Sequence, residues 1–233
     1  MIEQKSDKIR QKKHKKIILL DAGHGGIIEG EYQTAGKRAY FKNETLMSSD
    51  LSLEYREQNC DIKYYEGVGN RDIRTLIAEG LKKAEIDYRF INTTNRDMSL
   101  STRCNIANDF CKTFGTSNCI FISIHSNGFH KESAHGYSFY TSIGESMSDK
   151  YAEILYQEAE KMFPDERART DRTDGDLDKE ANFKVLRSTR CPAILGEMFF
   201  HTNYFECVNY LLSDAGKQKI ADTYINAIKR MIG

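Results

Sequence analysis

Short apolar runs alternate with amphipathic segments along most of this chain, and this alternation limits the folds open to it more than any other feature. The runs are continuously apolar, as expected for strands covered on both faces, whereas the segments between them have the period of helices. Strands are expected at 16–21, 88–92, 118–127 and 136–142, and helices at 70–85, 99–114, 146–163 and about 214–232, with Asn70 and Ser99 as N-caps. The pattern predicts a single α/β domain whose twisted, mostly parallel central sheet is flanked by helices on both faces.

Two segments depart from this alternation. Residues 1–15 are rich in Lys and Arg and contain no apolar core, so we expect a basic, flexible tail rather than a secretory signal. Residues 16–233 form the predicted domain, interrupted at about 27–65 by a polar, weakly periodic insertion. The sequence does not indicate a structure for this insertion.

Composition excludes several classes of protein. The 34 basic and 34 acidic side chains give a net charge of zero, which argues against a dedicated nucleic-acid binder. Mean hydropathy is −0.61, and we find no apolar run approaching the roughly 18 residues that a transmembrane helix requires. The six cysteines include no CxxC pair, so we expect reduced thiols rather than a disulfide framework or a cysteine-type zinc site.

Three of the apolar runs lead into residues that can bind metal or move protons. KIILLD is followed by His24, NCIFISI by His125, and PAILG by Glu197. In open α/β sheets the functional crevice lies at the carboxyl ends of the strands, so these three side chains are expected to meet. Two imidazoles with a carboxylate are a recurring zinc-ligand set, and a further Glu can transfer the proton of a water molecule. These considerations alone leave the third ligand open.

Three motifs carry a family resemblance. DAGHGG (21–26), SIHSNG (123–128) and GEMFFHTN (196–203) resemble the signature segments of type-3, zinc-dependent N-acetylmuramoyl-L-alanine amidases, a family that includes bacterial autolysins and phage endolysins. The resemblance runs from about Lys16 to the C-terminus and is interrupted by the insertion. It implies that residues 16–233 are an amidase catalytic domain.

The resemblance also implies a role for each site residue. His24 and His125 correspond to zinc ligands and Glu197 to the catalytic glutamate, with one Zn²⁺ per chain. The third ligand in the family is a Glu just ahead of the helix that follows the first strand, and Glu66 alone directly precedes the helix expected near Asn70. The other carboxylates of this stretch are interpreted as solvated: Glu29, Glu31, Glu44, Glu54 and Glu57. Three other histidines are rival ligands, namely His130, His135 and His201, of which the last two are interpreted as supporting or structural.

Other residues are expected to shape the site. Arg96, Arg103 and Asn108 are expected to hold the helix and loop beneath it, and Phe199, where the family often has a small residue, to reshape one wall of the cleft. The loop at 164–182, with Arg169 and Arg172, is a candidate border of the cleft facing the peptide stem. The insertion could cover the cleft, bind substrate or gate access, and the sequence does not choose among these.

The function implied is cleavage of the amide between the lactyl group of N-acetylmuramic acid and L-Ala in peptidoglycan. The expected partner is peptidoglycan, not nucleic acid, and the oligomeric state is not indicated. Absence of a signal or a wall-binding repeat favours a phage or prophage endolysin, made in the cytoplasm and acting on the wall. A bacterial autolysin, or a chain whose signal has been removed, is the other possibility. Two alternatives remain: a zinc peptidase acting on the stem peptide, and a non-catalytic wall-binding module.

Overall fold

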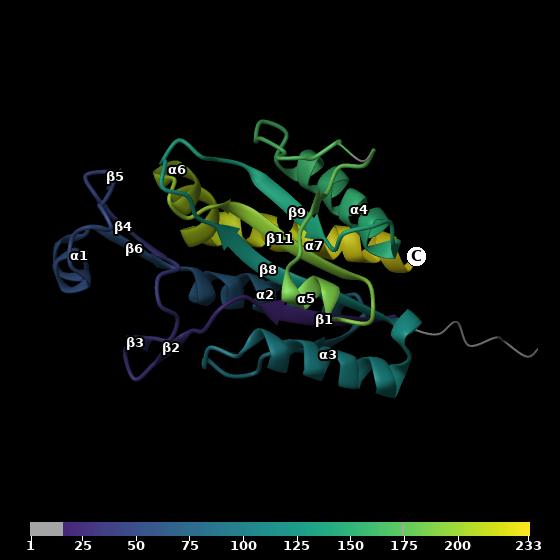
Figure 1. The fold of residues 1–233 in the computed structure, drawn as a ribbon. Helices are drawn as coiled ribbons and strands as arrows, with labels where there is room; N and C mark the ends of the chain where they lie inside the picture. The colour runs from purple at the N-terminus through teal and green to yellow at the C-terminus, as the bar shows by residue number, and fades with distance from the viewer. Residues whose placement is uncertain (1–15, 174) are drawn as a thin grey trace, which may run out of the picture.

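The computed structural model describes residues 16–173 and 175–233, and the predicted basic tail at 1–15 lies outside them. A six-stranded sheet in the order β10-β9-β11-β8-β1-β7 forms its centre (Figure 1). Every neighbouring pair is parallel except β9 and β11. The strands are β1 (Ile17–Ala22), β7 (Asp87–Phe90), β8 (Cys119–Asn127), β9 (Tyr137–Thr141), β10 (Lys179–Glu180) and β11 (Ala193–Phe200). The predicted mostly parallel sheet is confirmed.

Helices cover both faces of the sheet, because successive side chains of a buried strand point to opposite sides. Ile18 and Leu20 of β1 belong to the buried cluster that contains residues of the helices at 66–83, 147–162 and 214–232, whereas Ile17 and Leu19 belong to a second cluster with residues of the helices at 100–114 and 184–187. The helices are α2 (Glu66–Lys83), α3 (Leu100–Phe114), α4 (Met147–Met162), α5 (Lys184–Arg187), α6 (Tyr204–Glu206) and α7 (Asp214–Ile232). A 3-10 turn (Thr116–Asn118) and a π-helical turn (Cys207–Leu212) complete the set.

Helix starts agree with the sequence where a side-chain cap is present. The Ser99 side chain accepts a hydrogen bond from the Thr102 amide and caps α3, as predicted. The predicted cap Asn70 is wrong, because α2 begins four residues earlier, at Glu66. Tyr65 precedes that helix without a side-chain cap, so the sequence offers no conventional start signal there.

The insertion is ordered and forms two small sheets. β2 (Ile27–Ile28) pairs with β3 (Glu31–Tyr32), and β4 (Arg38–Lys42) lies between β5 (Thr45–Leu46) and β6 (Ile62–Tyr65), with α1 (Leu53–Asn59) alongside. The guanidinium of Arg38 lies over the rings of Tyr32 and Tyr65, 5.0 and 5.8 Å from their centroids, and so joins the two sheets. Figure 1 places this unit beyond the sheet edge at which β1 and β8 end.

Two further sequence expectations concern cysteines and membrane segments. All six cysteines are free thiols, and five of them are buried. Across residues 16–173 and 175–233, no helix is both long enough and apolar enough to cross a bilayer.

Candidate active site and metal centre

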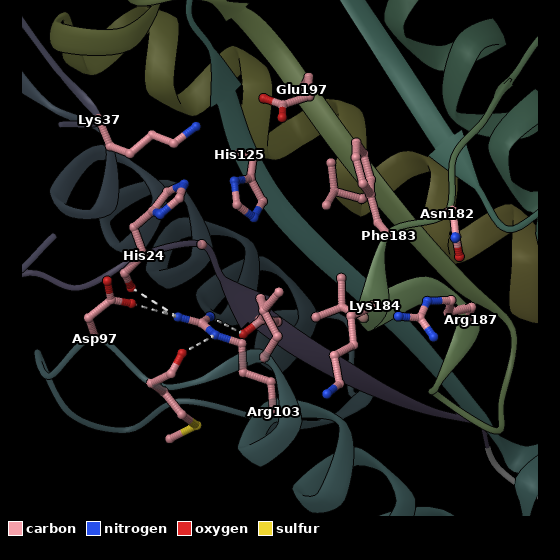
Figure 2. Close-up of a pocket in the computed structure, with 16 residues that line it drawn as sticks. His24, Lys37, Asp97, Arg103, His125, Asn182, Phe183, Lys184, Arg187 and Glu197 are labelled. Atoms are coloured by element: carbon pink, nitrogen blue, oxygen red, sulfur yellow. Dashed lines mark hydrogen bonds and ion pairs between the residues drawn. The ribbon is translucent and has the colours of Figure 1, made fainter. Parts of the chain in front are cut away.

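Three adjacent strands bring the predicted site residues to one edge of the sheet. His24 follows β1, His125 lies near the end of β8, and Glu197 lies in β11. β8 pairs with both β1 and β11, and Glu197 stands in register with His125. Figure 2 shows the three side chains around a common cleft.

His24, Glu66 and His125 form a compact group of side chains that could hold a metal ion, which we call the ligand group. Glu66 Oε1 lies 3.0 Å from His125 Nδ1 and 3.2 Å from His24 Nε2. The two imidazole rings meet edge to face with centroids 4.9 Å apart. Atoms bound at about 2.0–2.2 Å to one tetrahedral cation stand roughly 3.3–3.5 Å apart, so the spacing fits a single small metal ion. Within the described part of the chain, this is the one group of His, Cys, Asp and Glu side chains whose candidate ligand atoms all lie within 4.8 Å of one another.

The electrostatics of this group suit a cation. Glu66 is only 1% exposed, and burial alone would raise the pKa of its carboxyl group. Hydrogen bonds and charge from His125 and His24 outweigh burial and hold that pKa well below its usual range, so the carboxylate stays ionised. Its Oε2 is buried with no hydrogen-bond partner among the described residues. Buried polar atoms left in this way are suited to binding an ion.

Glu66 is placed by contacts between α2 and the insertion. The amide of Glu66 donates to the carbonyl of Lys37, and the Gly67 amide donates to the Tyr32 hydroxyl, so two free amides of the first helical turn are satisfied. A Cβ at Gly67 would lie 1.8 Å from the Gly25 carbonyl oxygen. Glycine at this position therefore lets the loop after β1 reach the helix end that carries the ligand.

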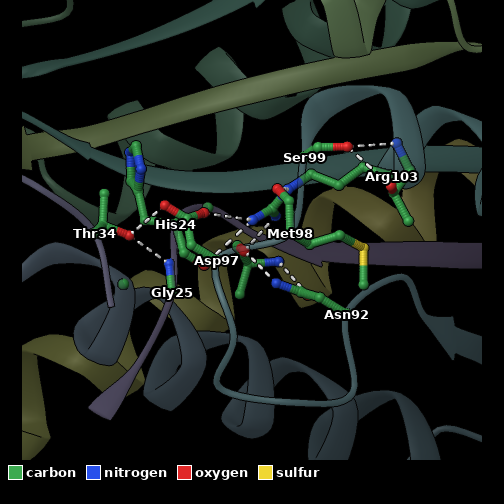
Figure 3. A network of polar contacts seen from close by, with 12 residues as sticks. His24, Gly25, Thr34, Asn92, Asp97, Met98, Ser99 and Arg103 are labelled. Carbon is green, nitrogen blue, oxygen red and sulfur yellow. Dashed lines mark hydrogen bonds and ion pairs between the residues drawn. The ribbon is translucent and has the colours of Figure 1, made fainter. Parts of the chain in front are cut away.

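His24 is placed by a buried ion pair beneath the loop. Its backbone is in the left-handed region, with φ of 64°. Arg103 donates to the carbonyls of Ala22 and His24, at 2.7 and 3.2 Å, and pairs with Asp21 at 2.6 Å (Figure 3). Ser123 donates to the other oxygen of Asp21. The pair thus fixes the conformation that aims the imidazole of His24 at Glu66.

Glu197 stands apart from the ligand group. Burial raises the pKa of its carboxyl group to about 7; the charge of Glu66 adds to this rise, whereas His125 and Lys37 oppose it. Its Oε2 is buried without a hydrogen-bond partner among the described residues. A carboxyl group with a pKa near neutrality can both take up and release a proton, which is the property of a general acid and base.

The cleft extends from the ligand group along α3 and α5. Its volume is about 630 Å³, which lies within the range of small-molecule sites. Lys37 and Glu197 lie at the end of the cleft that His24 and His125 line. Apolar side chains and two cations line the rest: Met98, Leu100, Phe183, Lys184, Val185, Arg187 and Leu195. The lining suits a ligand that combines apolar and polar groups.

Comparison with known proteins identifies the family. A family model described as N-acetylmuramoyl-L-alanine amidase matches residues 18–230. The chain is 32% identical over 213 residues to N-acetylmuramoyl-L-alanine amidase CwlM of Bacillus licheniformis, an alignment that covers 91% of this chain and 67% of that protein. The chain belongs to the N-acetylmuramoyl-L-alanine amidase family. Its enzyme class is therefore that of an amidase, as the sequence motifs predicted.

Solved amidases share the fold. The N-acetylmuramoyl-L-alanine amidase from Clostridium difficile 630 matches with a TM-score of 0.68 at 21% identity, covering 93% of this chain and 96% of that one. Ami1 from Mycobacterium smegmatis matches with a TM-score of 0.68 at 16% identity, covering 94% and 97%. Both comparisons agree with the single α/β domain described above.

The rival histidines lie outside this amidase's ligand group. His130 and His135 are exposed. His201 is 4% exposed, stacks on Tyr64 and lies 3.3 Å from the Ser126 hydroxyl through Nδ1. It therefore supports the strand end that carries His125, as expected.

The predicted contribution of Phe199 to the cleft wall is wrong, whereas the predicted supporting role of Asn108 agrees with the structure. Phe199 is fully buried between Phe163 and Tyr210 on the opposite face of the sheet, because β11 has an irregularity after Glu197. Asn108 bonds the Ser188 carbonyl and the Arg190 amide, and so holds the loop that leads into β11.

Lys37 is the cleft residue that the sequence reasoning missed. It belongs to the insertion, has φ of 51° and points its amine toward Glu197 and His24 in Figure 2. One lysine among 34 basic residues carries no signal in the sequence. The position of its amine depends on the turn at Lys37, and this turn forms only when the insertion packs against α2.

Proposed function

We propose that His24, Glu66 and His125 hold one Zn²⁺ and that Glu197 is the general base and acid of the amidase reaction. The proposal is supported above all by the contrast between two buried carboxyl groups: Glu66 is bracketed by two imidazoles, whereas Glu197 has a pKa near 7 and an unpaired oxygen. The family is generally zinc-dependent, and two imidazoles with one carboxylate are a catalytic zinc set.

The bond cleaved in this proposal is the amide between the lactyl group of N-acetylmuramic acid and L-Ala. Zinc, when bound, supplies a Lewis acid that lowers the pKa of water and polarises a carbonyl group. Glu197 accepts a proton from the attacking water as its oxygen bonds to the carbonyl carbon. It then donates that proton to the nitrogen of L-Ala as the carbon–nitrogen bond breaks, which leaves a lactyl carboxylic acid and a free amine; the acid then loses its proton to the amine or to solvent.

In this proposal, the residues around the ligand group hold its side chains in position. Arg103 and Asp21 hold the His24 loop, and the amide of Glu66 is fixed to the insertion at Lys37. The insertion therefore forms a wall of the site. Of the three roles that the sequence left open for it, gating is disfavoured by these hydrogen bonds to α2.

The test is digestion of purified peptidoglycan by the full chain, with and without a chelator and then with added zinc. We expect new L-Ala amino termini without new reducing sugars, loss of release on chelation, and recovery with zinc. New amino termini from other stem residues would indicate the zinc peptidase instead. Binding to the wall without release would indicate the non-catalytic module. The choice between a phage lysin and a bacterial autolysin stays a prediction.

A further inference from the structure

A second pocket lies at the carboxyl ends of β8 and β11, where Asn127 and Phe200 line it. Its volume is about 320 Å³, and it is lined by side chains and backbone from β8, β9, β10, β11 and two loops. Four of its side chains are cations and none is an acid: Lys131, Arg167, Arg169 and Lys179. Because of these four cations, we call this second pocket the basic pocket.

The basic pocket adjoins the reaction centre through two strands. Asn127 lines it and lies two residues beyond His125, on the same side of β8, so their Cα atoms are about 6.6 Å apart. Tyr140 also lines it, and its ring lies 5.4 Å from that of Phe183, which lines the cleft. Burial raises the pKa of Tyr140, with Glu197 adding to the rise and Arg169 opposing it. Tyr140 therefore stands between the proposed base and the basic pocket.

The cations of the basic pocket have carboxylates in their neighbourhood, Asp171 near Lys179 and Glu206 near Arg169, but no direct ion pair among the described residues. In the described ranges, none of the four forms an ion pair with a carboxylate. The nearby carboxylate of Glu206 is committed to the backbone amides of Gly136 and Phe200. Arg169 is held over the Phe200 ring and donates to the His135 carbonyl at 3.4 Å. Several like charges held in one concavity without direct ion pairs favour an anionic ligand.

The substrate of the proposed function has one part that supplies such an anion. Its N-acetylated sugars are uncharged apart from the released lactyl group, whereas the peptide carries free carboxylates. We propose that the basic pocket binds a carboxylate of the stem peptide and so orients the scissile amide between Glu197 and the ligand group. This rests on the proposed amidase function, and it assigns the peptide to the β9–β10 side of the site.

The experiment measures binding of two synthetic peptides to the full chain. Both begin with L-Ala; one has two free carboxylates and the other has both of them amidated. The variant is Arg167→Gln with Lys179→Gln, and the matched control is Lys83→Gln with Lys112→Gln, which removes the same charge from helix ends outside both pockets. Dissociation constants are compared by calorimetry, with the thermal unfolding midpoint as a check on folding.

We expect the unmodified chain and the control to bind the carboxylate peptide about 10-fold tighter than the amidated one. The pocket variant should lose about 10-fold for the carboxylate peptide and less than about 2-fold for the amidated one, since each charge contact contributes up to about 1 kcal/mol. With a soluble muramoyl peptide as substrate, KM should rise by a similar factor while kcat changes little. Equal binding of both peptides by all proteins, or equal losses for both peptides, would overturn the proposal.

This readout is independent of turnover. If the chain binds the carboxylate peptide through the basic pocket but releases no L-Ala amine from peptidoglycan, the amidase mechanism fails and the binding inference stands. If it releases the amine while the pocket variant binds both peptides as the unmodified chain does, the inference fails and the amidase mechanism stands.

Discussion

The two sides of the cleft hold buried carboxyl groups in opposite ways. On the ligand side, Glu66 lies between His24 and His125, and its pKa is held well below the usual range because their hydrogen bonds outweigh burial. On the base side, Glu197 has an unpaired oxygen and a pKa raised to about 7 by burial. The same side-chain type is thereby prepared for binding a cation in one place and for moving a proton in the other.

The two sides also differ in how they are anchored. On the ligand side, His24 lies in a loop held by Arg103 and Asp21, Glu66 begins a helix fixed to the insertion, and only His125 lies in a strand. Glu197 lies within a strand, paired with β8 and β9. The ligand side should therefore be the more sensitive to changes in distant contacts, because its geometry depends on them.

The largest effect is expected from Glu66→Gln. The neutral amide removes the charge that pairs with both imidazoles, so zinc affinity should fall by at least about 100-fold and release of L-Ala should be lost with it. Metal content after dialysis and amine release measure the two losses. The matched control is Glu54→Gln in the insertion, which should leave both unchanged; zinc retained by Glu66→Gln would contradict the assignment.

A smaller effect is expected from Arg103→Met. Removing the guanidinium leaves Asp21 buried without its ion-pair partner and frees the His24 carbonyl, which should cost about 3–5 kcal/mol in free energy of unfolding. Zinc affinity should fall by about 10-fold or more because the loop loses its fixed conformation. Chemical denaturation and a zinc titration test this. Lys112→Met, on the exposed face of the same helix, should change stability by less than about 0.5 kcal/mol.

The smallest effect is expected from Lys37→Met. The charge of Lys37 lowers the pKa of Glu197, so its removal raises that pKa. Activity requires ionised Glu197 and rises as pH rises through this pKa, so the acidic limb of the pH–rate profile should move to higher pH. Lys63→Met, in the same insertion, should leave the profile in place. A shift toward lower pH would contradict this placement of Lys37.

The strands of the sheet could be predicted from the sequence because each strand is marked by its own short run of apolar residues. Continuous apolar runs such as that of β8 are typical of strands buried on both faces, and the ends of β1, β8 and β11 meet for topological reasons. Glu66 was chosen for its position before a helix, although the structure places it as the first helical residue. The early start of α2 was missed because its first turn lacks both a side-chain cap and apolar periodicity.

What the sequence could not predict depends on contacts between distant segments. The small sheets of the insertion rest on Arg38 stacking between Tyr32 and Tyr65, which no periodicity reveals. The basic pocket gathers cations that lie up to 48 residues apart, from Lys131 to Lys179. Phe199 was misplaced because an irregularity in β11 turns its side chain to the other face.

The central claim is that Glu66 binds the metal and Glu197 moves the proton. Zinc titration and turnover of Glu197→Gln test it most directly. This variant should bind one zinc per chain with an affinity within about three-fold of the unmodified chain, because Glu197 is not a ligand. Its release of L-Ala from peptidoglycan should fall by about 100- to 10,000-fold, the range that general acid–base catalysis contributes. Loss of zinc together with activity, or activity kept with zinc bound, would contradict the account.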